Sequence, residues 1–161
     1  INRKSATMME EESNLKYIAY GSNMVEEQMA VRCPDAKLIG VGYLPDHRLE
    51  FYLHATVERS QIIGSHVPVA VWEISAADEH WLDLYEGYPT YYTKEGCTVR
   101  MADGSEISGM IYRMKHIRTA PPTQSYYKGI ANAYHELGLG FEIELVLEPA
   151  LMRALGREDK R

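Results

Sequence analysis

The sequence contains little of what marks several large classes of protein. Its 161 residues include only two cysteines, Cys33 and Cys97, too few for a disulfide framework, which favours a reducing cytoplasm over secretion. No apolar run is long enough to span a bilayer, and no signal-peptide pattern is present. The net charge of −6 disfavours nucleic acid or an anionic membrane as a partner. We therefore expect a cytoplasmic protein that contacts neither nucleic acid nor membrane.

Motifs for cofactors are also missing. The six histidines are scattered, and none is paired with another at the spacing of metal ligands. There is no phosphate-binding loop and no dinucleotide fingerprint. Neither cysteine lies in a known nucleophile motif, so both are predicted to be structural thiols. We expect no metal ion and no cofactor.

What is present predicts a single globular domain. Apolar residues make up 45% of the chain and charged residues 25%, and the length suits one domain with a real core. We expect residues 1–13 to form a flexible N-terminal extension and residues 14–161 a domain with a helical C-terminal segment. The apolar pattern predicts strands at 15–19, 38–44, 48–53, 67–74, 98–101 and 106–114, and helices at 25–31, 75–86, 125–137, 141–147 and 150–155. Residues 60–65 are predicted to be a loop and Pro149 to interrupt the last helical segment. The fold class is α+β, built on a small and mostly antiparallel sheet that could close.

The first candidate site is the turn between the first predicted strand and helix, Tyr20-Gly21-Ser22-Asn23-Met24. Gly21 has no side chain to keep a ligand away from the backbone. Ser22 and Asn23 are good N-cap residues, and unpaired N–H groups at a helix start can hold a carboxylate or another oxygen. The alternative is a capped turn that binds nothing.

The second candidate is Glu86, in the last turn of the helix predicted to begin at Ser75 with a capping box and to end at Gly87. The helix dipole disfavours a negative charge there, which raises the pKa of the carboxyl, and burial would raise it further. The neighbours are aromatic and apolar, and Trp81, Leu82 and Tyr85 are predicted to face the core. A carboxyl with a raised pKa can act as general base and then general acid near neutral pH. The alternative is a solvated glutamate at a frayed helix end.

Two tyrosines stand apart among the 12 in the chain. Tyr112 lies within a predicted core strand, where its hydroxyl needs a hydrogen-bond partner. Tyr126 begins the helix that follows Ala120-Pro121-Pro122. Most of the others are predicted to pack with their hydroxyl at the surface.

The order of these segments resembles the gamma-glutamylcyclotransferase-like family. The residues that carry the resemblance are Tyr20 to Met24, Leu82-Asp83-Leu84-Tyr85-Glu86-Gly87, Tyr112, and Ala120-Pro121-Pro122 with Tyr126. It runs from about residue 17 to 139, and the segment after the prolines is similar to the branch acting on free gamma-glutamyl amino acids and amines. The family implies a small mixed β-barrel flanked by helices, with a cavity at one end. It also implies that Glu86 is the catalytic acid/base, that residues 20–24 bind substrate mainly through backbone amides, that Tyr112 and Tyr126 line the pocket, and that no cofactor is needed.

The reaction implied converts a gamma-glutamyl amino acid or amine to 5-oxoproline and a free amine, and the partner is this small-molecule substrate. Relatives often carry Tyr-x-Arg shortly after the glutamate, where this chain has Tyr92-Thr93-Lys94, and arginine and lysine are not interchangeable where a carboxylate is gripped. Substrate identity therefore stays open. The alternatives are a cyclotransferase for a specialised gamma-glutamyl amine and a non-catalytic barrel that binds a small carboxylate. Either a monomer or a homodimer is compatible with the sequence.

Overall fold

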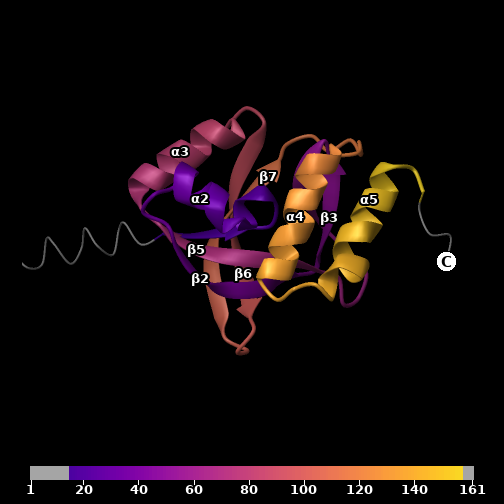
Figure 1. Ribbon diagram of the computed structural model, residues 1–161, viewed down its shortest axis with the longest axis horizontal. Coiled ribbons are helices and arrows are strands. Elements are labelled where there is room, and N and C mark those ends of the chain that lie inside the picture. Colours follow the sequence, from indigo (N-terminus) through magenta and orange to yellow (C-terminus); the bar gives the residue numbers. More distant parts are fainter. Residues whose placement is uncertain (1–14, 158–161) are drawn as a thin grey trace, which may run out of the picture.

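The computed structural model describes residues 15–157, and a closed barrel of five strands forms its centre (Figure 1). The predicted extension at residues 1–13 lies outside the described residues. The barrel order is β1-β5-β2-β6-β7, with β1 at Leu15–Ala19, β2 at Lys37–Pro45, β5 at His66–Ile74, β6 at Tyr92–Met101 and β7 at Glu106–Met114. The α+β fold class with a small mixed barrel is confirmed.

Almost all strand pairs in the barrel are antiparallel. β5 pairs with both β1 and β2, and β6 pairs with both β2 and β7. The barrel is closed by a parallel pairing of Tyr17 on β1 with Met110 on β7. The register of β2 shifts between Leu38 and Gly40, a bulge that the glycines of this strand predict. β6 begins six residues before the predicted strand at 98–101, so the hairpin turned by Asp103-Gly104 is longer than expected.

A second, two-stranded sheet contains β3 at His47–Tyr52 and β4 at His54–Arg59. The sequence predicts β3, with a loop at 60–65, but misses β4. The reason is the turn at Leu53, which adopts a positive φ of 63° without the glycine or asparagine that announces such a turn. The N–H of Leu53 donates to the carbonyl of Ala120, which ties this sheet to the segment preceding α4.

Helix α3 (Ala76–Glu86) has the ends that the sequence predicts. Ser75 forms a capping box with Asp78, and Gly87 ends the helix in the left-handed conformation at φ 66°. Leu82 is fully buried, whereas Trp81 and Tyr85 are 55% and 49% exposed, so the prediction that all three face the core is wrong for the two aromatics. Only Asp78 and Leu82 of this helix are buried, so just one narrow side of it faces the protein.

The other helices differ from expectation at their ends. Helix α2 (Glu26–Arg32) begins after Val25, because Ser22 and Asn23 lie in the short 3-10 helix η1 (Ser22–Met24) and cap nothing. The C-terminal π-helical segment η2 (Ile143–Leu147) continues directly into α5 (Glu148–Ala154). Pro149 lies in the first turn of α5, where proline is tolerated, so the predicted interruption is absent.

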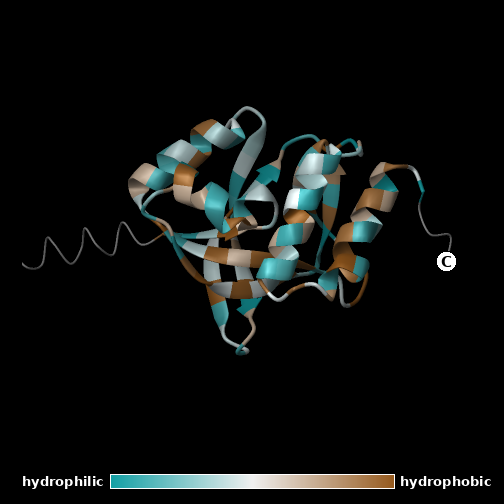
Figure 2. Ribbon diagram, in the orientation of Figure 1, coloured by the Kyte–Doolittle hydropathy of each residue, from teal (hydrophilic) through white to brown (hydrophobic). Residues whose placement is uncertain are grey.

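The buried core joins the barrel to the helices packed on it. It includes Ile18, Val69, Val99 and Ile111 of the barrel, Met29 of α2, Leu82 of α3, and Ile130 and Tyr134 of α4 (Gln124–Glu136). Helices α4 and α5 lie side by side next to β3 (Figure 1), and apolar and polar residues alternate along both of them (Figure 2). Within residues 15–157, every helix is too short or too polar to cross a membrane.

Candidate active site

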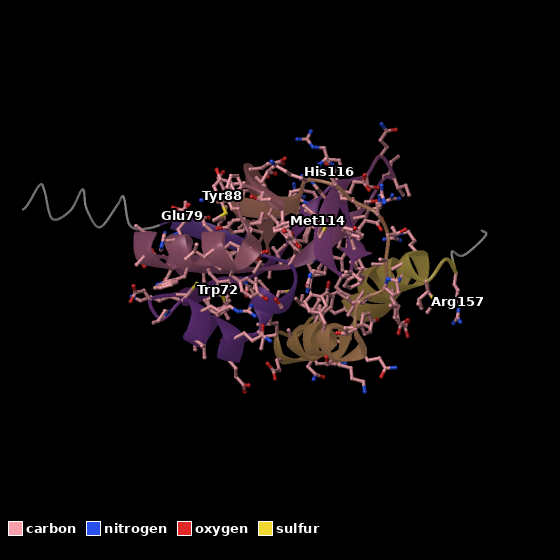
Figure 3. The ribbon with its side chains drawn as sticks, turned by 90° about the horizontal axis from the view of Figure 1, so that it is seen from above. Trp72, Glu79, Tyr88, Met114, His116 and Arg157 are labelled. Carbon is pink, nitrogen blue, oxygen red and sulfur yellow. The ribbon has the colours of Figure 1, made fainter. Side chains whose placement is uncertain are left out.

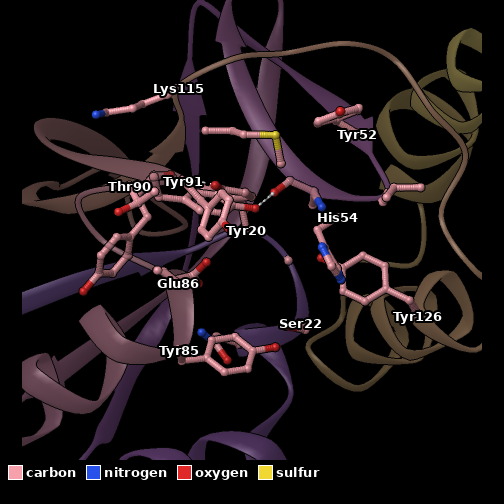
Figure 4. Close-up of a pocket in the computed structure, with 18 of the residues that line it drawn as sticks. Tyr20, Ser22, Tyr52, His54, Tyr85, Glu86, Thr90, Tyr91, Lys115 and Tyr126 are labelled. Carbon is pink, nitrogen blue, oxygen red and sulfur yellow. Dashed lines mark hydrogen bonds between the residues drawn. The ribbon is translucent and has the colours of Figure 1, made fainter.

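A cavity of about 790 Å³ lies where β1 and β7 end and β6 begins (Figure 4). Among the described residues, those that line it come from eight elements, β1, η1, β3, β4, α3, β6, β7 and α4. The predicted site residues that line it are Tyr20, Gly21, Ser22, Asn23, Glu86, Tyr112 and Tyr126. Residues separated by more than a hundred positions in the chain are thus brought together. Met24 is the exception: its side chain is buried in the core and its N–H donates to the carbonyl of Gly21, so neither faces the cavity.

Among the described residues that line the cavity, Glu86 supplies the only carboxylate. Its side chain points into the space between Tyr20 and Tyr85 (Figure 4). Within residues 15–157 it has neither an ion pair nor a hydrogen-bond partner. Burial raises the pKa of Glu86 from 4.5 to about 7, against the opposing effect of the positive charge of Arg32. Burial is therefore the main cause of the shift, whereas the sequence argument started from the helix dipole.

The apolar surroundings of Glu86 also differ from expectation. The neighbours Trp81 and Tyr88 do not line the cavity, although Leu84 and Tyr85 do. Tyrosines on the barrel and on α4, which are distant in the sequence, line the cavity together with Glu86. Tyr17 and Tyr92 are two of these, and neither was singled out from the sequence. Tyr92 lies in the Tyr92-Thr93-Lys94 segment, which could have pointed to it.

The loop carrying Gly21, Ser22 and Asn23 is held by the side chain and carbonyl of Asn23, which is only 3% exposed. The indole N–H of Trp72 donates to the Asn23 carbonyl at 3.0 Å, and the Asn23 amide donates to the Tyr17 hydroxyl at 2.9 Å. The guanidinium of Arg32 donates to the Asn23 side-chain oxygen. Within residues 15–157, the N–H groups of Gly21, Ser22 and Asn23 have no acceptor. They are free to hold an oxygen of a ligand.

Gly21 is needed because α4 approaches it closely. A Cβ atom at this position would lie 3.2 Å from Cβ of Ala55 and 3.3 Å from the hydroxyl oxygen of Tyr126. Both distances are tighter than ordinary van der Waals contact. The absence of a side chain thus lets Ala55 and the Tyr126 hydroxyl pack closely against Gly21, whereas the sequence argument concerned the approach of a ligand to the backbone.

Three tyrosine hydroxyls around the cavity donate their single proton to the protein. Tyr20 donates to the carbonyl of Tyr112 at 2.6 Å, Tyr92 to the carbonyl of Ala55 at 3.2 Å, and Tyr112 to Oδ1 of Asp83 at 2.5 Å. A phenol has one proton and two acceptor positions. These three hydroxyls therefore have only lone pairs left to offer a ligand.

Two other tyrosine hydroxyls accept a hydrogen bond from the protein instead of donating one. Tyr17 accepts from the Asn23 amide, and Tyr126 accepts from the N–H of Ala55 at 3.0 Å. Their protons are uncommitted and can be donated to a ligand oxygen. Burial raises the pKa of Tyr126 to about 12, so its hydroxyl stays protonated at neutral pH. The cavity thus combines one carboxylate, free proton donors near the loop and free lone pairs elsewhere.

The outer rim of the cavity is lined by exposed basic side chains, whereas its floor is lined by buried tyrosines. Exposed residues here include the cation Lys115 and the imidazoles of His54 and His116. His116 lies on the side of the molecule away from α4 (Figure 3), whereas Tyr126 reaches the cavity from α4 (Figure 4). Sequence reasoning missed these rim residues because no local pattern marks them.

Lys94, which stands where relatives often carry arginine, does not line the cavity. Its ammonium contacts Glu79 at 3.1 Å and Asp83 at 2.8 Å, outside the cavity wall. Within residues 15–157, no group of three or more histidine, cysteine, aspartate or glutamate side chains could hold a metal ion. Both thiols, Cys33 and Cys97, are free.

Comparisons with known proteins agree with one another. The family model described as "Gamma-glutamyl cyclotransferase, AIG2-like" matches residues 17–130. A human gamma-glutamylcyclotransferase is 32% identical over 154 residues, covering 88% of this chain and 80% of the human one, and the bovine gamma-glutamylcyclotransferase is 31% identical over 141 residues, covering 80% and 74%. A solved structure called "Gamma-glutamyl cyclotransferase" superimposes with a TM-score of 0.76 at 29% identity, covering 84% of this chain and 86% of that one. A mouse AIG2-like protein shares the fold at a TM-score of 0.54 and 13% identity, covering 71% and 82%.

Proposed function

Since the chain belongs to the gamma-glutamyl cyclotransferase, AIG2-like family and is an enzyme of that type, we propose that it converts gamma-glutamyl amino acids to 5-oxoproline and a free amino acid. The observation that supports this most is Glu86, an unpaired carboxyl with a pKa of about 7 in a cavity lined by tyrosine hydroxyls. A group with this pKa can both accept and return a proton at neutral pH.

In the proposed reaction the substrate attacks itself. Its α-ammonium loses a proton to Glu86, and the resulting amine attacks the γ-carbonyl carbon and closes a five-membered ring. The amide C–N bond then breaks as Glu86 returns this proton to the departing nitrogen. Glu86 next takes the second proton from the ring nitrogen, so that the lactam keeps one N–H, and passes it to the released amine, which leaves as an ammonium. Because the nucleophile and the electrophile belong to one molecule, the enzyme mainly has to hold the chain in its folded form.

A substrate oxygen would bind where proton donors converge. The free N–H groups of residues 21–23 and the uncommitted protons of Tyr17 and Tyr126 support such a site. This oxygen is either the α-carboxylate or the oxyanion that develops on the γ-carbonyl, and donors of this kind stabilise both. Met24 has no part in the proposal, since its N–H and side chain are turned away.

The rim supports an amino acid rather than a neutral amine as the leaving group. Lys115, His54 and His116 lie at the cavity mouth, and in the part of the chain that the structure describes Glu86 is the only carboxylate that lines the cavity. A leaving amino acid carries a carboxylate, which this rim would attract, whereas a simple amine does not. The relatives named gamma-glutamylcyclotransferase, at 31–32% identity, support a gamma-glutamyl substrate. A cytoplasmic location fits the two free thiols.

The test is formation of 5-oxoproline from matched substrates, such as gamma-glutamyl-alanine and gamma-glutamyl-ethylamine, by the parent protein and by Glu86→Gln. We expect product from the parent, a higher kcat/KM for the amino acid, and a loss of about a hundredfold or more in the variant, as for a lost general base. Equal rates for parent and variant would remove Glu86 from the mechanism. Product from the ethylamine alone would select a gamma-glutamyl amine as substrate. A ligand that raises the melting temperature without any product would indicate a binding protein.

A further inference from the structure

We propose that Asp83 is a positioning residue, which holds the hydroxyl proton of Tyr112 so that Tyr112 presents a lone pair to the substrate's amine. This inference rests on the proposed function, because it assigns how the amine of that substrate is oriented. Asp83 itself does not line the cavity and would act only through Tyr112.

The contact between the two side chains is short and sheltered. The Tyr112 hydroxyl lies 2.5 Å from Oδ1 of Asp83, and the tyrosine is only 2% exposed while it lines the cavity. The ring of Tyr17 packs edge-on against that of Tyr112, with centroids 5.8 Å apart, and limits its movement. Tyr112 is thus fixed in both ring position and hydroxyl direction.

Lys94 fixes the other end of this arrangement. Its ammonium lies 2.8 Å from Oδ1 and 2.9 Å from Oδ2 of Asp83, and it also contacts Glu79 at 3.1 Å. An aspartate that faces an ammonium is an acceptor only, so the proton in the contact with Tyr112 must come from the tyrosine. Lys94 therefore acts on Asp83 and does not bind the substrate.

The consequence for the reaction concerns the direction of the amine. After Glu86 takes one proton, the substrate amine keeps two N–H groups and one lone pair, and the lone pair must point at the γ-carbonyl carbon. An acceptor at Tyr112 can take one of these N–H groups. A Tyr112 hydroxyl turned the other way would instead donate to the nitrogen and occupy the lone pair needed for attack. By accepting the Tyr112 proton, Asp83 therefore leaves a lone pair of that hydroxyl, and not its proton, facing the substrate amine.

The decisive variant is Asp83→Asn, which keeps the size of the side chain. Its oxygen would stay with Lys94 and its NH₂ group would donate to Tyr112, which turns the hydroxyl proton toward the cavity. We expect kcat/KM for 5-oxoproline formation to fall by about tenfold or more, in the range of one misdirected hydrogen bond. In a Tyr112→Phe background, which has no hydroxyl to orient, Asp83→Asn is expected to change kcat/KM by less than about twofold.

The acid limb of the pH profile should keep its position in Asp83→Asn, because Glu86 is untouched. The matched control is Glu73→Gln, which removes the carboxylate of another lysine ion pair, with Lys16. Neither residue lines the cavity, so this change should leave kcat/KM unchanged. Should Asp83→Asn fail to fold, Lys94→Met replaces it, made in the parent protein and in Tyr112→Phe. We expect kcat/KM to fall several-fold in the parent background only, where the Tyr112 hydroxyl is present. Equal losses with and without the Tyr112 hydroxyl would overturn the inference and leave the function standing. No product from the parent protein would instead overturn the function.

Discussion

Two glutamates of this protein, the buried Glu50 and the partly buried Glu86, have opposite surroundings. Glu50 on β3 is 1% exposed, and its Oε1 lies 2.7 Å from Arg48 and 3.1 Å from Nε of Arg153. Glu86 at the end of α3 has no ion-pair partner within residues 15–157, and its burial raises its pKa to about 7. A buried carboxylate that is paired serves to hold elements together, whereas one that is left unpaired is available for proton transfer.

The pair at Glu50 connects the C-terminal helix to the rest of the fold. Arg153 belongs to α5, and besides contacting Glu50 it donates to the carbonyl of Leu49 at 2.7 Å. The position of α5 beside β3 (Figure 1) is thus fixed by one arginine that satisfies both a side chain and the backbone. None of these three residues lines the cavity.

The largest effect on stability is expected from Glu50→Gln. The change leaves the partly buried guanidinium of Arg153 without its charge partner, and we expect the free energy of unfolding to fall by on the order of 3 kcal/mol. Urea unfolding measures it. The matched control is Glu58→Gln, which removes the exposed partner of Arg48 and should cost less than about 0.5 kcal/mol. The folded fraction of Glu50→Gln should retain the parent kcat/KM. Similar costs for both variants would break the distinction between the two kinds of glutamate.

A smaller effect is expected in the pH profile of activity. Glu86 must be ionised to accept a proton, so kcat/KM should rise with pH and reach half its limit near pH 7. The positive charge of Arg32 lowers the pKa of Glu86, so Arg32→Met should move this limb to higher pH. Initial rates of 5-oxoproline formation from about pH 5 to about pH 9 measure both. Arg100→Gln, an exposed change in the β6–β7 hairpin, is the control. A limb that stays in place in Arg32→Met would contradict the assignment to Glu86.

The smallest effect is expected in the stability of Glu86→Gln. A carboxyl whose pKa is raised from 4.5 to about 7 by folding binds its proton more tightly in the folded state. The parent therefore loses stability as the pH rises through this interval, and glutamine removes that loss. We expect the melting temperature of Glu86→Gln to exceed that of the parent by a few degrees at pH 8, with the difference vanishing toward pH 4. A variant less stable than the parent at pH 8 would mean that the charge is stabilised by contacts absent from this structure.

Much of the fold followed from local signals in the sequence. The capping box at Ser75 and the glycine at position 87 set the limits of α3, and therefore placed Glu86 at a helix end. The Asp103-Gly104 turn set the β6–β7 hairpin. Turn chemistry and capping act over a few residues, so a single sequence reveals them. The β4 strand was missed because the positive φ of Leu53 has no such local signal.

The sequence by itself thus determined which elements carry the predicted site residues Tyr20 to Asn23, Glu86, Tyr112 and Tyr126. Only the tertiary structure decided what surrounds them. It buries Glu86 among tyrosines from β1, β6, β7 and α4, and it commits the protons of Tyr20, Tyr92 and Tyr112 while leaving those of Tyr17 and Tyr126 free. The pKa of a carboxyl and the direction of a hydroxyl both depend on groups that lie nearby in space, and these groups are far away along the chain.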